Sequence, residues 1–418
     1  MDFSFSSDQL LVRDTVRQFM EAEMRPLLRE YDRNEKFPAE QVRRLGDLGC
    51  CGMLIPEEYG GSSTDTVTYA LMIEEVARVC ASTAVTLSVT NSVAAAPILR
   101  HGTEAQKKKY LSRLAHGEIL GGFCLTEPGT GSDAAGIQTR AVRDDDSYVI
   151  NGTKSWVTNG GVSGVYVVFA KTDPGAGSRG ITAFLVEPLF PGFRVSRYED
   201  KMGLRLSRSA EIVFEDCRVP AENLLGVEGQ GLRVALGALD GGRIGIAAQS
   251  VGVAQGAFEA AVRYAKQRRT FGHPIAEYQA IQWMIADMAT EIEAARALTH
   301  YAAFLRDTEL VREAASVSAS SSLEGRSSAI KGLSRQGALA PETARSHVGP
   351  HSARAKLYAS EMANRVCARA VQVHGSVGYS RETDVERYYR DARVLTIYEG
   401  TSEMQRLVIA RDLLRKGS

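Results

Sequence analysis

The chain has 418 residues, and its hydrophobic share of 44% is enough to fill two or three domain cores rather than one. Fifty Lys and Arg residues balance fifty Asp and Glu residues, so the formal net charge is zero. This balance argues against a nucleic-acid-binding protein, whose affinity would come mainly from neutralised phosphates. The one dense basic run, at positions 107–109, is interpreted as a solvated helix face rather than as a binding patch.

The six cysteines and seven histidines are scattered along the chain without metal-ligand spacing. We therefore expect neither a protein-bound metal nor a disulfide scaffold. The first residues do not combine a basic segment with an apolar core, and no uninterrupted apolar run reaches about eighteen residues. The sequence thus predicts no signal peptide and no transmembrane helix, and a reducing, cytoplasmic location fits best.

The first part of the chain, residues 1–122, is predicted to be a helical domain. Apolar residues at Leu10, Leu11, Val16 and Phe19 indicate a first amphipathic helix, with its cap at Ser7–Asp8. Later stretches such as AEQVRRLGDLG and TYALMIEEVARVC keep the helical period.

Residues 123–230 are predicted to form a β-domain. Short β-rich runs follow one another, among them SYVI, KSWVT, VYVVFAKT, ITAFLVE and AEIVFEDCRV. Because no helix separates them, an antiparallel sheet, barrel or sandwich is favoured over βαβ units. Asn151-Gly152, between two of these runs, predicts a hairpin turn, since both residues tolerate positive φ.

Residues 231–418 are predicted to be helical again. The stretch YQAIQWMIADMATEIEAARALTHYAAFL keeps apolar residues at three- and four-residue spacing for about seven turns, which is typical of a bundle or a subunit interface. Residues 308–349 are rich in Ser, Arg, Ala and Gly, and we expect a long, mobile surface insertion there. A functionally silent segment is the favoured interpretation, and a partner-binding or regulatory role is the alternative.

Three stretches could hold a ligand. The glycine-rich loop FCLTEPGTGSDAAG, residues 123–136, could offer free N–H groups to phosphate or carbonyl oxygens, with a plain surface turn as the alternative. In KSWVTNGG, Trp156 and Thr158 share a face and could stack on a flat heterocycle, unless the Trp is a core residue. In KQRRTFGHPIAEYQAIQ, an Arg, a Thr and an aromatic residue at a chain break could grip a diphosphate and an adenine. The alternative is a purely structural role, in which the arginines at the C-terminal end of the helix bond its last carbonyl groups.

Near the C-terminus, LTIYEGTSEMQRL places two carboxylates four residues apart. Ser402 and Gln405 form a predicted capping box, so a helix is expected to begin near Ser402. Glu403 then lies in the first helical turn, where acidic residues are favoured for structural reasons. Glu399 lies before the helix beside the flexible Gly400, and no such explanation covers it. We therefore interpret Glu399 as the residue that takes part in the reaction, and we reject a paired-carboxylate site.

Together these stretches resemble the acyl-CoA dehydrogenase family, and specifically its short-chain, butyryl-CoA-type branch. The resemblance covers nearly the whole chain apart from residues 308–349. It is carried by LTEPGTGSD, NGTKSWVTNGG, KMGLRLS, IVFEDCRVP, LDGGRIGIAAQSVGVAQ, RRTFG, VQVHGSVGY and RYYRDARVLTIYEGTSEMQRLVIA, in the family's order.

The resemblance implies an α+β multidomain fold with an N-terminal helical domain, a middle β-domain and a C-terminal four-helix bundle. It implies FAD, bound noncovalently where the domains meet, and a homodimer or homotetramer in which a neighbouring subunit supplies part of the site. The implied reaction is oxidation of an acyl-CoA to the trans-2-enoyl-CoA, with electrons passed to electron-transfer flavoprotein, as in fatty-acid β-oxidation. A flavin oxidase or monooxygenase on the same scaffold is the alternative, as is a dehydrogenase of branched or cyclic acyl-CoA.

The family's site residues match particular positions of this chain. Glu399 matches the usual catalytic base, and the substrate contacts fall on Ser132, Asp240, Arg243 and Gly400. The FAD contacts on the flavin side match Phe123, Leu125, Thr126, Gly131, Ser132, Trp156, Val157 and Thr158. Those to the diphosphate and adenosine, contributed across a subunit interface, match Arg268, Thr270, Phe271, Gln279, Gln372, Gly375 and Ser376. Thr401 and Glu403 match a further FAD-contacting position.

Gly242 distinguishes this chain within the resemblance. Some related enzymes draw their base from the position just before the arginine that matches Arg243. Here that position is Gly242, which has no side chain to serve, and this favours Glu399. The chemistry requires a base at contact distance, because the α-C–H of a thioester is very weakly acidic. A carboxylate in a dry pocket, with its pKa raised by desolvation, suits that task.

Overall fold

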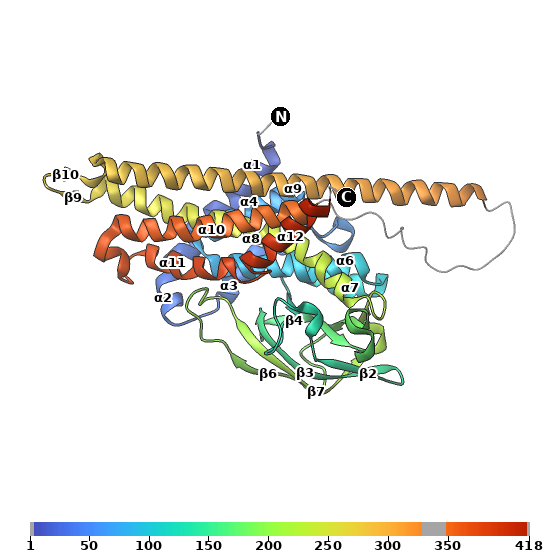
Figure 1. The fold of residues 1–418 in the computed structure, drawn as a ribbon. Coiled ribbons are helices and arrows are strands. Elements are labelled where there is room, and N and C mark those ends of the chain that lie inside the picture. The colour runs from blue at the N-terminus through green and yellow to red at the C-terminus, as the bar shows by residue number, and fades with distance from the viewer. Residues whose placement is uncertain (1–3, 328–347, 416–418) are drawn as a thin grey trace.

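The computed structural model describes residues 4–327 and 348–415. A layer of helices lies on one side of the molecule and a β-domain lies on the other (Figure 1). The N-terminal helices are α1 Ser7–Phe19, α2 Leu28–Arg33, α3 Ala39–Asp47, α4 Thr66–Val79, α5 Ala81–Ser88, α6 Ala96–His101 and α7 Glu104–Ala115. The cap of α1 is Ser6, one residue before the predicted Ser7–Asp8, because Ser6 forms a reciprocal capping box with Gln9.

Helix α4 and the segment from α5 to α6 form the centre of the N-terminal domain. Residues 81–101 are long and apolar enough to cross a membrane by length and composition, but 89% of the apolar 18-residue window within them is buried inside the protein. Their apolar character is therefore explained by packing against the rest of the core.

The β-domain contains β1 Leu120–Cys124, β2 Arg140–Asp144, β3 Ser147–Thr158, β4 Ser163–Lys171, β5 Ile181–Val186, β6 Phe193–Tyr198, β7 Ser209–Pro220 and β8 Leu224–Leu225. The strand order is β6-β7-β3-β2-β4-β5-β8, with β1 paired to β4. Most pairs are antiparallel as predicted, whereas β1 and β2 both meet β4 in parallel. Strands β4 and β5 contribute apolar side chains to a core on each face of the sheet, so the β-domain is attached to the helices through a hydrophobic interface.

The predicted hairpin turn at Asn151-Gly152 is wrong, because β3 runs straight through both residues. The turn between β2 and β3 lies at Asp145 and Asp146, where Asp145 has φ of 53°. Asn151 instead bonds Asp216 across a register shift between β3 and β7. Glycine is needed at 152 because a Cβ there would lie 2.5 Å from the hydroxyl of Thr139.

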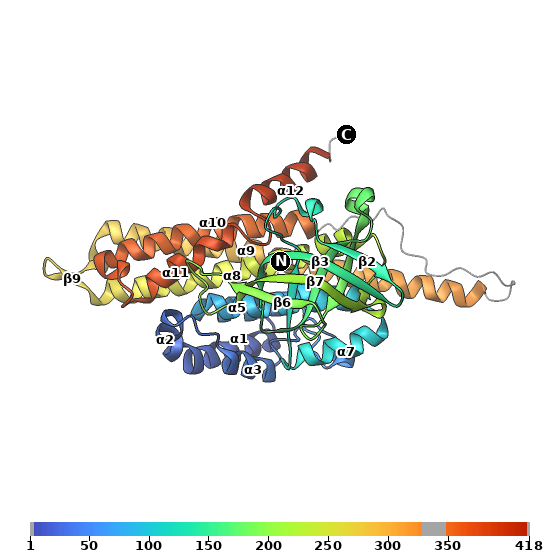
Figure 2. The ribbon, with the colours of Figure 1, turned by 90° about the horizontal axis from the view of Figure 1, so that it is seen from below.

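The C-terminal region consists of α8 Gly231–Gln267, α9 Gln279–Ser327, α10 Val348–His374, α11 Asp384–Arg393 and α12 Ser402–Arg415, with a small hairpin of β9 Arg269–Thr270 and β10 His273–Pro274. Helices α8, α9 and α10 pack against one another, and α11 and α12 both pack on α10 (Figure 2). The predicted surface insertion is partly wrong, since α9 continues to Ser327 and α10 begins at Val348. Ala, Leu, Glu and Arg in 308–327 favour a helix despite the missing apolar period. The rest of that insertion, 328–347, lies outside the described residues.

A buried ion pair fastens the glycine-rich loop to the sheet. Lys154 of β3 is 0% exposed, and its Nζ lies 2.8 Å from Glu127 Oε1 and 3.1 Å from the Leu125 carbonyl. The Glu127 carboxylate also accepts hydrogen bonds from the backbone N–H of Gln138 and from both donors of Thr139. Lys154 therefore holds the start of the loop at Leu125, and the Glu127 carboxylate holds its end at Gln138 and Thr139.

We expect Lys154→Met to destabilise the protein, because it leaves the Glu127 carboxylate buried without its cationic partner. Breaking a buried pair in this way costs about 3–5 kcal/mol. Thermal denaturation of purified Lys154→Met should show a clearly lower melting temperature. Arg194→Met is the control, since it breaks the exposed pair of Arg194 with Glu215 and should change little. Equal melting temperatures for the two variants would contradict the structural role of Lys154.

Candidate active site

Glu399 and Gly400 form a left-handed turn immediately before α12. Their φ angles are 53° and 87°, and glutamate rarely adopts the first of these values. The preceding residue, Tyr398, is fixed to α8 because its hydroxyl donates to Gln249 at 2.6 Å. The prediction that Glu399 lies in a loop ahead of the helix is confirmed by this geometry.

The predicted capping box is wrong by one residue. Thr401 caps α12, because its hydroxyl accepts the backbone N–H of Met404 at 3.3 Å. The Ser402 hydroxyl is buried and has no hydrogen-bond partner among the described residues. Gln405 does not reach back to a backbone N–H but donates its amide to the carbonyls of Glu399 and Gly400. The left-handed turn at Glu399–Gly400 directs those two carbonyls toward the Gln405 amide.

The Glu399 carboxylate occupies space that α8 leaves open at Gly242. A Cβ built on Gly242 would lie 2.6 Å from Glu399 Oε2, so any larger residue would displace the carboxylate. Glu399 Oε2 is shielded from solvent and has no hydrogen-bond partner among the described residues. Burial raises the pKa of Glu399 to about 7, against the opposing effects of Arg243 and Lys356. A carboxylate of this kind can accept a proton near neutral pH.

Glu403, four residues later, has a different environment. Its side chain is 80% exposed and lies 3.9 Å from Arg406, on the next turn of α12. Hydrogen bonds from its own backbone N–H and from the Thr401 hydroxyl hold the pKa of Glu403 below its ordinary value. The two carboxylates therefore do not form a proton-sharing pair, and this agrees with the prediction from the sequence.

Arg243 and Asp240 form a second feature of α8 near Glu399. Arg243 is 8% exposed and its Nη1 lies 2.6 Å from Asp240 Oδ1, while its Nε has no hydrogen-bond partner among the described residues. Burial raises the pKa of Asp240, and the Arg243 charge opposes that effect. The arginine thus has one buried donor without a partner among the described residues, while its charge acts on Glu399.

On the β-domain, the glycine-rich loop and Trp156 form an open surface. Trp156 has φ of 58° at a register shift between β3 and β7, and its indole is 60% exposed, whereas Val157 is buried. The Ser155 N–H donates to the Thr126 carbonyl at 2.9 Å, which ties the loop to β3. Gly129 and Gly131 have open space where a Cβ would stand. A cleft of about 340 Å³ adjoins this loop, lined by residues including Pro128, Thr130 and Thr153.

These features fit a flavin, because an exposed indole offers a stacking plane and the open glycines permit close approach to backbone N–H groups. Phe123, Leu125, Thr126 and Thr158 are buried or partly buried beside them, and Ser132 is exposed in the loop. A glycine-rich loop that is open to solvent and a partly buried hydroxyl at Thr158 supply the donors that a ring edge requires. No group of three or more His, Cys, Asp or Glu side chains suited to a metal ion occurs among the described residues.

The residues predicted to hold the adenosine end lie elsewhere in the chain. The β9–β10 hairpin and the start of α9 are at the end of the bundle that is remote from the β-domain in both views (Figures 1 and 2). This end carries the exposed Phe271, together with Arg268, Thr270 and Gln279. The last turns of α10 carry Gln372, and the 3-10 turn that follows α10 carries Gly375 and Ser376. One chain therefore does not bring them to Glu399 and Trp156, and their role remains a prediction that needs a second subunit.

Sequence reasoning missed Lys356, a lysine in the N-terminal part of α10 that is 0% exposed. Its Nζ donates to the Gly400 carbonyl at 2.8 Å. Lys356 lies within a buried face of α10 made of small residues, among them Ala353, Ala359 and Ser360. A lysine at such a position was the available signal.

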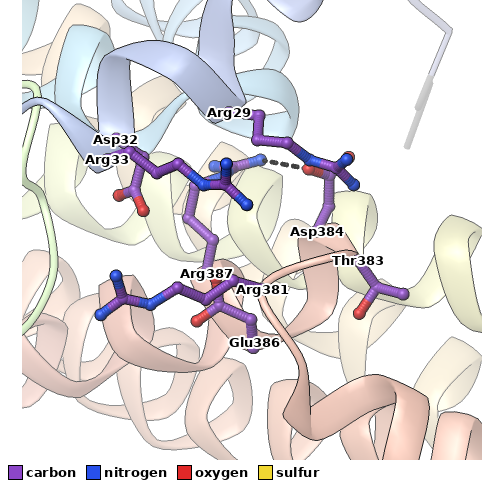
Figure 3. Close-up of a pocket in the computed structure, with 8 residues that line it drawn as sticks. All are labelled: Arg29, Asp32, Arg33, Arg381, Thr383, Asp384, Glu386 and Arg387. Carbon is purple, nitrogen blue, oxygen red and sulfur yellow. Dashed lines mark ion pairs between the residues drawn. The ribbon is translucent and has the colours of Figure 1, made fainter.

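A separate polar pocket lies between α2 and α11 (Figure 3). It is lined by Arg29, Asp32, Arg33, Arg381, Thr383, Asp384, Glu386 and Arg387 and has a volume of about 20 Å³. That volume holds about one water molecule. Asp32 and Glu386 are both bonded to Arg390, so the acidic groups here serve to dock α11 on α2. This pocket is a structural junction rather than a reaction site.

Comparisons with known proteins cover the whole chain. Residues 6–118, 122–217 and 229–414 match the family descriptions "Acyl-CoA dehydrogenase, N-terminal domain", "middle domain" and "C-terminal domain", the last in two segments that meet at residue 321. The "Acyl-CoA dehydrogenase, short-chain specific" of Clostridium acetobutylicum is 43% identical over 99% of this chain and 100% of its own.

Solved structures also share this fold, and two of them are similar to the chain over nearly its whole length. The butyryl-CoA dehydrogenase of Megasphaera elsdenii has 42% identity and a TM-score of 0.89, with 99% of this chain and 100% of that chain covered. A chain from a study of the electron transferring flavoprotein of Acidaminococcus fermentans has 43% identity, the same TM-score and the same coverage.

The raised pKa of Glu399 predicts a pH-dependent stability. A carboxyl whose pKa rises from 4.5 unfolded to about 7 folded costs stability as pH rises through that interval. Glu399→Gln removes this cost, so the variant should melt at a higher temperature than the wild type at pH 8 and at about the same temperature at pH 5. The difference should reach about 3 kcal/mol at most.

Glu403→Gln is the matched control, because the exposed Glu403 has a lowered pKa and should give a small effect of opposite sign. Melting curves of the three proteins across pH measure both effects. A Glu399→Gln variant with a pH-independent stability difference would show that the Glu399 carboxyl is not desolvated.

Proposed function

The chain belongs to the acyl-CoA dehydrogenase family, and from that premise we propose that it oxidises short- to medium-chain acyl-CoA thioesters to trans-2-enoyl-CoA. FAD is the cofactor of this function, and electron-transfer flavoprotein is the electron acceptor. The observation that supports this most directly is the Glu399 carboxylate, which faces the bare backbone of α8 at Gly242. Its Oε2 is shielded from solvent and has no hydrogen-bond partner among the described residues.

Glu399 is the base that removes the α-proton. Its Oε2 has no partner among the described residues and is free to receive the proton. Because burial favours its neutral form, protonation relieves the desolvation cost while the acyl group loses its proton. Arg243 and Lys356 counter this preference, so part of the population is ionised at neutral pH. When bound, FAD supplies the acceptor for the β-hydride.

The chain's own residues hold the two ligands. Trp156 and the 125–132 loop form the flavin side, and Thr158 offers a hydroxyl to the ring edge. Asp240 and Arg243 of α8, with Ser132 and Gly400, form the substrate side. The seven residues predicted to contact the diphosphate and adenosine serve the FAD of a neighbouring subunit. A homodimer or homotetramer is therefore part of the proposal. The exposed Phe271 and Trp283, 90% and 64% exposed, support a subunit contact at that end of the bundle.

Oxygen as the acceptor, in an oxidase or monooxygenase, is not favoured, because relatives at 43% identity include the short-chain acyl-CoA dehydrogenases of Clostridium acetobutylicum and of Mus musculus. Substrates with branched or cyclic acyl chains are a finer alternative within the same reaction. A cytoplasmic location and a place in fatty-acid β-oxidation complete the proposal, and the six free, buried cysteines are consistent with a reducing compartment.

Anaerobic mixing of the FAD-loaded protein with butyryl-CoA should bleach the flavin absorbance. Glu399→Gln should bind FAD and butyryl-CoA normally and lose bleaching by at least about 1000-fold, the upper part of the range for a general base. Admission of air should reoxidise the wild-type flavin slowly, whereas electron-transfer flavoprotein should do so rapidly. Rapid reoxidation by air alone would contradict the dehydrogenase assignment. Normal bleaching of the flavin in Glu399→Gln would show that another residue is the base. A panel of esters of different length and branching sets the substrate range.

Gly242→Ala should reduce the bleaching rate by about 10-fold or more, because its Cβ would push the Glu399 carboxylate out of reach. The matched control is Gly241→Ala, on the adjacent position of α8, where a Cβ would meet nothing within 4 Å. Both changes replace a helical glycine and share the same helix-propensity gain of about 1 kcal/mol. Equal rates in the two variants would show that the space at Gly242 is not required by the base.

A further inference from the structure

Two buried side chains converge on the carbonyls of the Glu399–Gly400 turn. Lys356 Nζ, from α10, donates to the Gly400 carbonyl at 2.8 Å. Gln405 Nε2, from α12, donates to the Gly400 carbonyl at 2.9 Å and to the Glu399 carbonyl at 3.1 Å. Lys356 and Gln405 are both 0% exposed. The turn that carries the base is therefore fastened from two helices.

The conformation of this turn needs such support. A non-glycine residue in the left-handed region costs about 1–2 kcal/mol, and Glu399 has φ of 53°. Gly400, at 87°, must be glycine for a further reason, since a Cβ there would lie 2.7 Å from Gln405 Nε2. Strain of this kind persists at a functional site when the surroundings determine the backbone conformation.

The Lys356 ammonium also carries charge into the site. The groups facing Glu399 are Arg243 of α8 and Lys356 of α10, with the phenols of Tyr69 on α4 and Tyr398 in the preceding loop. Burial lowers the pKa of Lys356 to about 8, against the effects of Glu399, Glu361 and Glu403. Lys356 is therefore still largely charged at neutral pH, where Glu399 titrates.

We propose that Lys356 is a positioning residue for Glu399: its ammonium fixes the Glu399–Gly400 turn through the Gly400 carbonyl, and its charge favours the carboxylate form of the base. Gln405 supplies the uncharged half of the same support. This inference rests on the proposed function for its kinetic consequence, whereas its electrostatic part concerns Glu399 alone.

Three substitutions of Lys356 separate the bond from the charge. Lys356→Met removes both, Lys356→Gln keeps a donor for the Gly400 carbonyl without the charge, and Lys356→Arg keeps the charge. Gln405→Leu removes the uncharged bonds and leaves the ammonium in place. Each variant is compared as the FAD-loaded protein, with flavin content measured first.

The kinetic measurement is the rate of flavin bleaching by butyryl-CoA across pH. With Lys356→Met and Lys356→Gln, the rising limb should move to higher pH by about 1 unit, the shift expected on losing one nearby opposite charge. Lys356→Met should also lose about 10-fold at its optimum, because the turn is loosened. Lys356→Arg should keep the wild-type limb, and Gln405→Leu should be slower at all pH values without a shift.

A thermodynamic measurement reads the same charge effect without turnover. The stability difference between Glu399→Gln and its parent, followed across pH, reports the titration of Glu399 in the folded protein. In the Lys356→Gln background, the midpoint of that difference should move to higher pH by the same amount. A midpoint that stays in place would overturn the inference whether or not the protein oxidises butyryl-CoA. Absence of bleaching by the wild type would count against the proposed function alone.

Discussion

The desolvation of one carboxylate against a bare helix surface is the constraint around which the site is arranged. Glu399 can approach α8 because Gly242 has no side chain, and at this position its Oε2 is shielded from water. Burial then raises its pKa to about 7, into the range in which a base can both hold and release a proton. The approach requires α8, α10 and the start of α12 to lie together, so the helical bundle is the part of the fold on which the chemistry depends.

The positive charges near Glu399 limit the rise in pKa that desolvation causes. A carboxyl with no cation nearby would stay protonated and could not act as a base. Arg243 and Lys356 each oppose the burial effect, and both are almost fully buried themselves. Glu403 shows that sequence proximity is not the cause, because it lies four residues away and its exposure leaves its pKa below the ordinary value. The environment, rather than the residue type, separates the two glutamates.

Much of the fold could be predicted because helical, β-rich and helical patterns follow one another along the chain, and local periods reveal them. The errors came where a local signal was outweighed by a neighbour. Asn151-Gly152 has the residues of a turn, but pairing of β3 with β7 extends through it as a bulge. Serine is a common N-cap residue, but the left-handed turn at Glu399–Gly400 makes Thr401, rather than Ser402, the N-cap of α12. In the first case a pairing distant in sequence decided between two locally acceptable structures, and in the second the preceding turn did.

The sequence by itself determined the order of the domains and the identity of the family through its motifs, and it predicted Glu399 rather than Glu403 as the base, because these depend on local patterns and on residue types. Only the tertiary structure decided that the Glu399 carboxylate lies on Gly242 and that Lys356 and Gln405 hold the turn behind it. The residues concerned come from α8, α10 and α12, up to about 160 positions apart. Burial, hydrogen-bond partners and the resulting pKa are properties of that packed arrangement, and no local pattern in the chain specifies them.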